Sequence, residues 1–100
     1  MDNALADRPS VVLHSHRGEI LAIARRFGIS EIRVFGSVAR GDDGPGSDID
    51  LIVSFEPGSM SLGDLVNFED ELSALLGVSV DVVSSAARRI ESVQRHAIAL

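Results

Sequence analysis

Two carboxylates stand close together in the middle of the chain, at Asp48 and Asp50, in a stretch that we predict as a strand over Asp48–Phe55. Side chains two positions apart on a strand point to the same face, with their Cα atoms about 6.6 Å apart. Carboxylates so placed repel each other, and no Arg or Lys lies between residues 41 and 85 to offset them. A divalent cation such as Mg²⁺ would offset this repulsion, because it takes carboxylate, water and phosphate oxygens as ligands. An edge strand with two hydrated Asp side chains is the alternative, which the pair alone leaves open.

A third carboxylate, Asp81, lies at the centre of an otherwise apolar stretch that we predict as a strand over Val78–Ser84. If this strand lies beside Asp48–Phe55, the Asp81 carboxylate completes a cluster of three. Taken by itself, Asp81 is more simply explained as an exposed residue on a strand that alternates between two faces.

Gly36 and Ser37 follow a third predicted strand, Ile29–Phe35, and precede a short helical turn that contains Arg40. Glycine lets the backbone come close to a ligand, and the exposed N–H groups at the start of a helix attract phosphate. The Ser37 hydroxyl and the Arg40 guanidinium would add hydrogen-bond donors for phosphate oxygens. Because Gly-Ser turns are common, this feature is weak evidence when taken alone.

The elements that must position these residues are predicted from hydrophobic periodicity and capping residues. We expect an amphipathic helix over Ser10–Phe27 with Ser10 as its N-cap, and a second helix over Leu62–Leu76 that begins with a capping box. A turn-rich loop over Gly41–Ser47 and a last helix from Ala86 towards Leu100 complete the chain. Helices and strands therefore alternate, which predicts a small central sheet covered by helices.

The composition bounds what the chain can do. Its 100 residues suffice for one domain, of which we expect residues 1–9 to be a flexible N-terminus. The formal charge of −6 argues against coating nucleic acid or binding an anionic membrane. No signal peptide or spanning segment is evident, so we expect a cytoplasmic protein. Part of the acidity, at Glu69, Asp70 and Glu71, fits the solvated face of a helix.

Together these features are far more specific than any one of them. Gly36-Ser37, ten further residues, then Asp48-Ile49-Asp50, with Asp81 on a later strand, resembles the nucleotidyltransferase superfamily that includes DNA polymerase beta. The chain is most similar to the minimal, MNT-type domains of that superfamily. The fuller match is the stretch GSVARGDDGPGSDIDLIV, in which the fitting residues are Ser37, Arg40, Gly41, Ser47, Asp48, Asp50 and Leu51. The resemblance implies an α+β nucleotidyltransferase fold, with a small mixed β-sheet flanked by helices.

The resemblance also implies the roles of the three carboxylates. Asp48 and Asp50 would bind two Mg²⁺ ions, of which one holds the triphosphate and the other lowers the pKa of the attacking hydroxyl. Asp81 would ligate the second metal ion and help to remove the proton from the nucleophile. The implied reaction is in-line attack on an α-phosphate with pyrophosphate leaving, so catalysis rests on positioning and charge neutralisation.

The implied nucleotide-binding residues are Gly36, Ser37, Arg40 and Ser47. Gly36 and Ser37 would hold the β- and γ-phosphates, and Arg40 would supply positive charge nearby. Because the chain has no Lys, Arg40 and Mg²⁺ would have to provide the charge that phosphates need.

The partner is also implied by the resemblance. MNT domains are commonly paired with HEPN-domain proteins in toxin–antitoxin modules, where the MNT protein resembles an antitoxin that transfers AMP from ATP to a tyrosine of the HEPN toxin. This chain has no Tyr, so it cannot be its own tyrosine target. The implied partners are thus a HEPN toxin and ATP, with no membrane and no direct nucleic-acid contact. A non-catalytic antitoxin that acts by occlusion is the alternative, and a homodimer or a larger heteromer both remain open.

Overall fold

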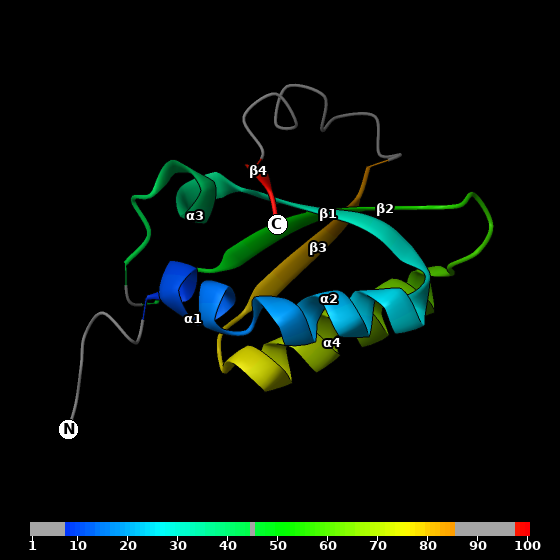
Figure 1. Ribbon diagram of the computed structural model, residues 1–100, viewed down its shortest axis with the longest axis horizontal. Coiled ribbons are helices and arrows are strands. Elements are labelled where there is room, and N and C mark those ends of the chain that lie inside the picture. The colour runs from blue at the N-terminus through cyan, green and yellow to red at the C-terminus, as the bar shows by residue number, and fades with distance from the viewer. Residues whose placement is uncertain (1–7, 45, 86–97) are drawn as a thin grey trace.

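The computed structural model describes residues 8–44, 46–85 and 98–100. Figure 1 shows how the helices and strands of these residues are arranged. In chain order the elements are α1 (Pro9–Ser15), α2 (Arg17–Phe27), β1 (Ile29–Phe35), α3 (Gly36–Arg40), β2 (Ile49–Phe55), α4 (Leu62–Leu76), β3 (Val80–Ser84) and β4 (Ile98–Ala99).

The strands form one mixed sheet in the order β3-β2-β1-β4. β1 pairs antiparallel with β2 and with β4, whereas β2 and β3 run parallel. This arrangement confirms the α+β class with a mixed sheet. The strand that carries Asp50 is central, so the edge-strand alternative for the Asp48–Asp50 pair is wrong.

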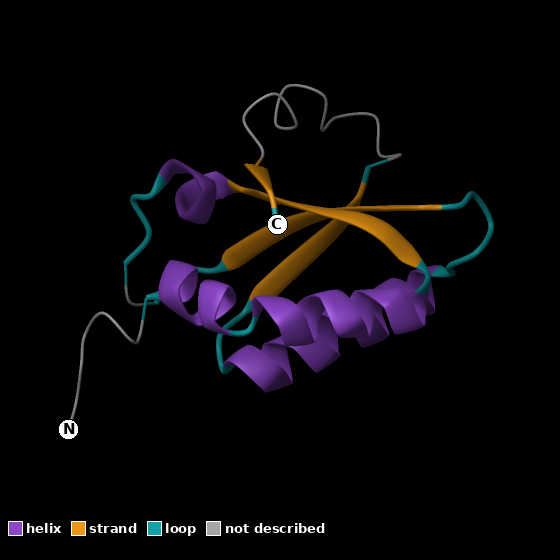
Figure 2. Cartoon of the chain, in the orientation of Figure 1, coloured by secondary structure: helices purple, strands orange, loops and turns teal. Residues whose placement is uncertain are grey.

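The two longest helices, α2 and α4, lie side by side on one face of the sheet (Figure 2). Their buried residues recur at four-residue steps, as at Ile20 and Ala24 in α2 and at Phe68 and Leu72 in α4. Phe68 is fully buried and meets Phe27 edge to face, with ring centroids 5.4 Å apart. None of the helices in the described residues is long and apolar enough to span a membrane.

The start of α4 follows the sequence prediction closely. Ser61 Oγ accepts a hydrogen bond from the backbone N–H of Asp64, and the Asp64 carboxylate accepts one from the N–H of Ser61, which together form the predicted capping box. The helix ends at Gly77, whose φ of 71° is left-handed.

The predicted helix Ser10–Phe27 is two helices in the structure, separated at His16, where φ is −109° and ψ is 17°. Ser15 Oγ donates to the carbonyl of Val11, and His16 Nδ1 lies 3.0 Å from the carbonyl of Val12. Such local bonds from side chains compete with the helical ladder, and Gly18 weakens it further just beyond the break. Helical periodicity continues across the break, which is why the pattern predicts a single helix.

Both ends of the chain differ from expectation. Pro9, which we expected in a flexible N-terminus, is buried and begins α1, and Arg8 rather than Ser10 is the N-cap residue. The last predicted helix falls mostly on residues 86–97, outside the described residues. The prediction that this helix continues towards Leu100 is wrong, because Ile98 and Ala99 form a strand that pairs with β1. Pairing with the open edge of a distant strand overrides the local helical pattern there.

Candidate active site

The predicted site residues meet where β1 ends and where β2 and β3 begin. Asp50 of β2 is the register partner of Asp81 in β3 and of Phe35 at the end of β1. The expected adjacency of the two strands is therefore confirmed. Asp48 is exposed and immediately precedes β2.

Gly36 is the residue through which α3 approaches these carboxylates. Its φ is 74°, and a Cβ added to it would clash with Oδ2 of Asp50. Glycine is required here twice, for the left-handed backbone and for the space that the Asp50 carboxylate fills. The Gly-Ser turn and the Asp50 carboxylate therefore belong to one packed unit.

Charge repulsion is concentrated on Asp50. Burial raises the pKa of this carboxyl above its ordinary value of 3.8, and the nearby charges of Asp81 and Asp48 raise it further. A hydrogen bond between the Asp50 and Asp81 side chains acts in the same direction, whereas the positive charge of Arg40 opposes it. The charged form of Asp50 is thus disfavoured in the fold, and a bound cation would relieve that cost.

The donor set suits a hard divalent cation, since it consists of carboxylate oxygens. In residues 8–44, 46–85 and 98–100, no group of three or more His, Asp or Glu side chains is placed to hold a metal ion. Asp50 and Asp81 are register partners on adjacent strands, and the charge of Asp48 acts on Asp50. Such an arrangement fits Mg²⁺, which is typically bound by one or two carboxylates and completed by water and phosphate oxygens.

The predicted phosphate-binding residues border the carboxylates. Ser37 is half-buried in the first turn of α3, and no side chain caps that helix. The Arg40 guanidinium is exposed and donates to Asp42 over 3.2 Å. Exposed pairs of this kind contribute little free energy, so Arg40 is free to change partner. Ser47 Oγ accepts a hydrogen bond from the N–H of Gly44, which closes the turn ahead of Asp48.

Comparison with known proteins agrees with this geometry. The Nucleotidyltransferase domain family matches residues 18–99, a range that contains every residue of the site. The chain belongs to that family. The resemblance drawn from the Gly-Ser and Asp motifs is confirmed.

Three similar proteins place this nucleotidyltransferase more closely. Protein adenylyltransferase MntA of Thermococcus cleftensis is 41% identical over 76 residues, which cover 76% of this chain and 73% of that protein. A chain solved as a minimal nucleotidyltransferase is 44% identical with a TM-score of 0.77, over 91% of this chain and 95% of that one. A toxin–antitoxin structure solved with AMP-PNP is 26% identical with a TM-score of 0.62, over 70% of this chain and 59% of that one. The nucleotidyltransferase is thus of the minimal type and homologous to protein adenylyltransferases.

A buried carboxylate that sequence reasoning missed holds the loop of this nucleotidyltransferase in place. Oδ2 of Asp43 accepts a hydrogen bond of 2.8 Å from the backbone N–H of Ser10, and Oδ1 lies 3.3 Å from Nη2 of Arg8. The Asp43 side chain is fully buried and so supplies the N-terminal cap that α1 lacks locally. Its partners stand 33 and 35 residues earlier in the chain, so no local signal distinguishes Asp43 from its exposed neighbour Asp42.

These contacts set the pKa of Asp43. Burial by itself raises the pKa, but the hydrogen bonds from Ser10 and the charge of Arg8 outweigh it, so the pKa lies below the ordinary 3.8. The charged carboxylate therefore stabilises the folded state above about pH 4. That stabilisation is lost as the pH falls through the lowered pKa.

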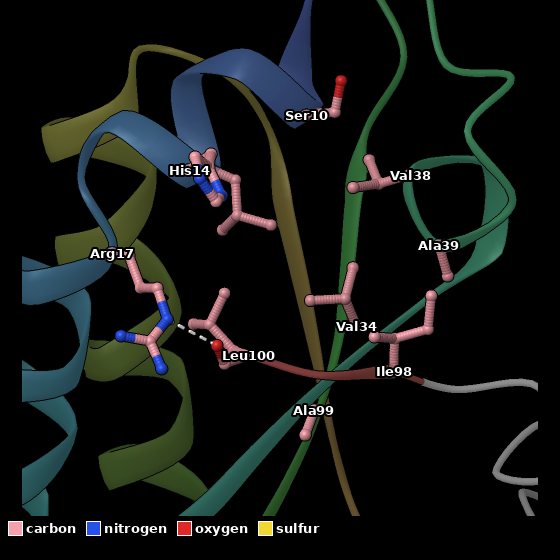
Figure 3. A pocket seen from close by; sticks show the side chains of 10 residues that line it. Ser10, His14, Arg17, Val34, Val38, Ala39, Ile98, Ala99 and Leu100 are labelled. Carbon is pink, nitrogen blue, oxygen red and sulfur yellow. Dashed lines mark hydrogen bonds between the residues drawn. The ribbon is translucent and has the colours of Figure 1, made fainter.

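A separate cavity of about 330 Å³ lies between α1, the start of α2, β1, α3 and β4 (Figure 3). Its lining is mainly apolar, and Figure 3 shows Val34, Val38 and Ile98 away from His14 and Arg17. At its rim, Nε of Arg17 donates to the carbonyl oxygen of Leu100 over 2.6 Å. None of the three predicted carboxylates lines it, so it is separate from the catalytic candidates.

Replacing Gly36 should disable the site without unfolding the protein. In Gly36→Ala the new Cβ meets the Asp50 carboxylate, and the left-handed backbone costs about 1–2 kcal/mol. We expect nucleotide transfer to fall about 10²-fold, the scale at which misplacement by an ångström acts. Gly18→Ala is the matched control, because a Cβ there meets nothing within 4 Å. The measurement is the rate of nucleotide transfer by each variant. Equal rates would contradict the packing of Gly36 against Asp50.

Replacing Asp43 should destabilise the protein in a pH-dependent way. In Asp43→Ala the charge-assisted bonds to Ser10 and Arg8 are lost, so the free energy of unfolding at pH 7 should fall by about 1.5–3 kcal/mol. The difference from wild type should shrink as the pH falls below the pKa of Asp43. Urea unfolding at a series of pH values measures both effects. Asp42→Ala, at an exposed position, should change stability by less than about 0.5 kcal/mol. A deficit that does not vary with pH would show that the charge of Asp43 is unimportant.

Proposed function

We propose that this nucleotidyltransferase transfers AMP from ATP to a tyrosine hydroxyl of a partner HEPN toxin and so acts as its antitoxin. The observation that carries the proposal is the pairing of Asp50 with Asp81 directly beneath the Gly36 turn. A fold gains nothing from two repelling carboxylates at this position unless a cation and phosphates come to them. Homology to protein adenylyltransferases supports AMP as the transferred group.

The chain's own residues would act as follows. The backbone of Gly36 and the hydroxyl of Ser37 bind the terminal phosphates, and Arg40 leaves Asp42 to pair with phosphate oxygens. The hydroxyl of the acceptor attacks the α-phosphorus in line, a new O–P bond forms, and the bond to the β-phosphate breaks as pyrophosphate leaves. Asp81, the exposed member of the carboxylate pair, accepts the hydroxyl proton.

The proposed cofactor is Mg²⁺, two ions in all, held by Asp48, Asp50 and Asp81. When bound, Mg²⁺ neutralises phosphate charge and acidifies the attacking hydroxyl. Burial and the charges of Asp81 and Asp48 raise the pKa of Asp50, so its charged form would be favoured by a cation held there. Because the chain has no Lys, Arg side chains alone would otherwise have to neutralise the charge of the phosphates.

The proposed acceptor lies on another molecule. No Tyr is present among the 100 residues, so a tyrosine linkage must form on the partner. The similar toxin–antitoxin structure with AMP-PNP supports both a toxin partner and an adenine nucleotide. We further propose that residues 1–100 form a single domain and that the protein works in the cytoplasm, where ATP is available.

Transfer can be tested with a HEPN-domain protein as the proposed partner, Mg²⁺ and ATP labelled at the α-phosphate. We expect label on a tyrosine of the toxin and loss of toxin activity. Asp48→Ala should lower the transfer rate by about 10²-fold or more, since it removes a carboxylate that would hold the cation at the reacting phosphate. Asp70→Ala, a matched change on the exposed side of α4, should leave the rate unchanged.

Two results would contradict the proposal. Neutralisation of the toxin without label, unaffected by Asp48→Ala, would favour the non-catalytic antitoxin that acts by occlusion. Label on a serine of either chain would retain the enzyme but overturn the tyrosine acceptor. Replacing Mg²⁺ with a chelator should abolish labelling. Full activity in the presence of the chelator would show that transfer does not need a metal ion.

A further inference from the structure

Among the described strands, β3, which carries Asp81, lies at one edge of the sheet and has β2 as its neighbouring strand. The N–H of Ile49 in β2 donates to the carbonyl of Ser79, just before β3. Backbone N–H groups alternate between the two sides of a strand. The N–H groups of Val80 and Val82 therefore point to the side away from β2, and the N–H of Asp81 points toward β2. Both N–H groups find acceptors outside the sheet.

Those acceptors are two side chains of α4. Glu69 Oε2 accepts a hydrogen bond of 2.9 Å from the N–H of Val82, and Ser73 Oγ accepts one of 3.3 Å from the N–H of Val80. Contrary to its expected place on a solvated face, Glu69 is therefore half-buried and bonded to the sheet. Glu71 does lie towards solvent, where it pairs with Arg26.

The spacing of the two elements explains why both bonds form at once. Glu69 and Ser73 are four residues apart on one face of α4, a rise of about 6 Å along the helix. Val80 and Val82 are two residues apart on β3, a rise of about 6.6 Å. Because Gly77 reverses the chain between them, the helix and the strand run antiparallel, and the two pairs come into register. Figure 1 shows the two elements joined by this short turn.

Resting on the proposed function, we infer that Glu69 is a positioning residue, which with Ser73 clamps β3 so that Asp81 stays beside Asp50. The clamp holds the residues on either side of Asp81. In the described residues β2 is the neighbouring strand of β3, so the bonds from Glu69 and Ser73 hold the side of β3 that faces away from β2. A carboxylate is a stronger acceptor for a backbone N–H than a neutral oxygen, so Glu69 supplies the larger part of the clamp.

The side chain of Glu69 touches neither Asp81 nor Asp50 through any hydrogen bond in the described residues. Its action is on the backbone, which distinguishes it from the three carboxylates of the site. A substitution that keeps an acceptor oxygen should therefore keep function, although it removes the charge.

The test combines amide exchange with transfer kinetics on the full chain. In Glu69→Ala we expect hydrogen exchange at the Val82 amide to rise at least about tenfold, while that of Val53 in the centre of β2 stays unchanged. We expect kcat for transfer to fall about tenfold with KM for ATP within about twofold, because Asp81 is misplaced and the phosphate-binding turn is not. Glu69→Gln keeps an acceptor oxygen and should restore both readouts to near wild type. Glu71→Ala, two residues away, should match wild type.

The outcomes separate the inference from the function it rests on. Unchanged Val82 exchange in Glu69→Ala overturns the clamp, as does a rise shared equally by Val53, which would mean general destabilisation. Raised Val82 exchange with unchanged kcat also overturns it, since Asp81 would then not depend on the clamp. If wild-type protein transfers no AMP, the proposed function fails, and the clamp on β3 is decided by the exchange of Val82 alone.

Discussion

The rest of the structure depends on one unfavourable interaction, the repulsion between carboxylates on adjacent strands. Asp50 and Asp81 face each other across the parallel β2–β3 pair, and burial together with these charges raises the pKa of Asp50. A pair like this gains its stability from other parts of the fold. The central place of β2 and the packing of α2 and α4 beneath it provide a rigid base on which this repulsion is tolerated.

Rigidity at the site itself comes from contacts between elements that are distant in the sequence. Asp43 fastens the loop before Asp48 to the start of α1, and Glu69 fastens the strand that carries Asp81 to α4. In both cases a carboxylate accepts a backbone N–H that secondary structure leaves unpaired. The acidic residues of the chain thus stand in three settings: the candidate site, the internal anchors Asp43 and Glu69, and the exposed surface.

Family membership and geometry agree here. The matched range 18–99 contains the whole candidate site, and within it the Gly36 backbone packs against the Asp50 carboxylate. Because the charge needed to hold ATP is scarce, with no Lys and an exposed Arg40 paired to Asp42, cation binding and nucleotide binding are expected to be interdependent.

The sequence by itself determined the features that depend on neighbours along the chain. Periodicity and capping residues predicted α4 to the residue, and the spacing of Gly36, Ser37, Asp48 and Asp50 identified the family. Only the tertiary structure decided the rest: the break at His16, the strand at Ile98–Ala99, the buried Asp43 and the use of Glu69. Each of these depends on a partner that folding brings close from elsewhere in the chain or on a local bond that competes with periodicity. The local sequence pattern does not indicate such partners, because these contacts form only when folding brings distant residues together.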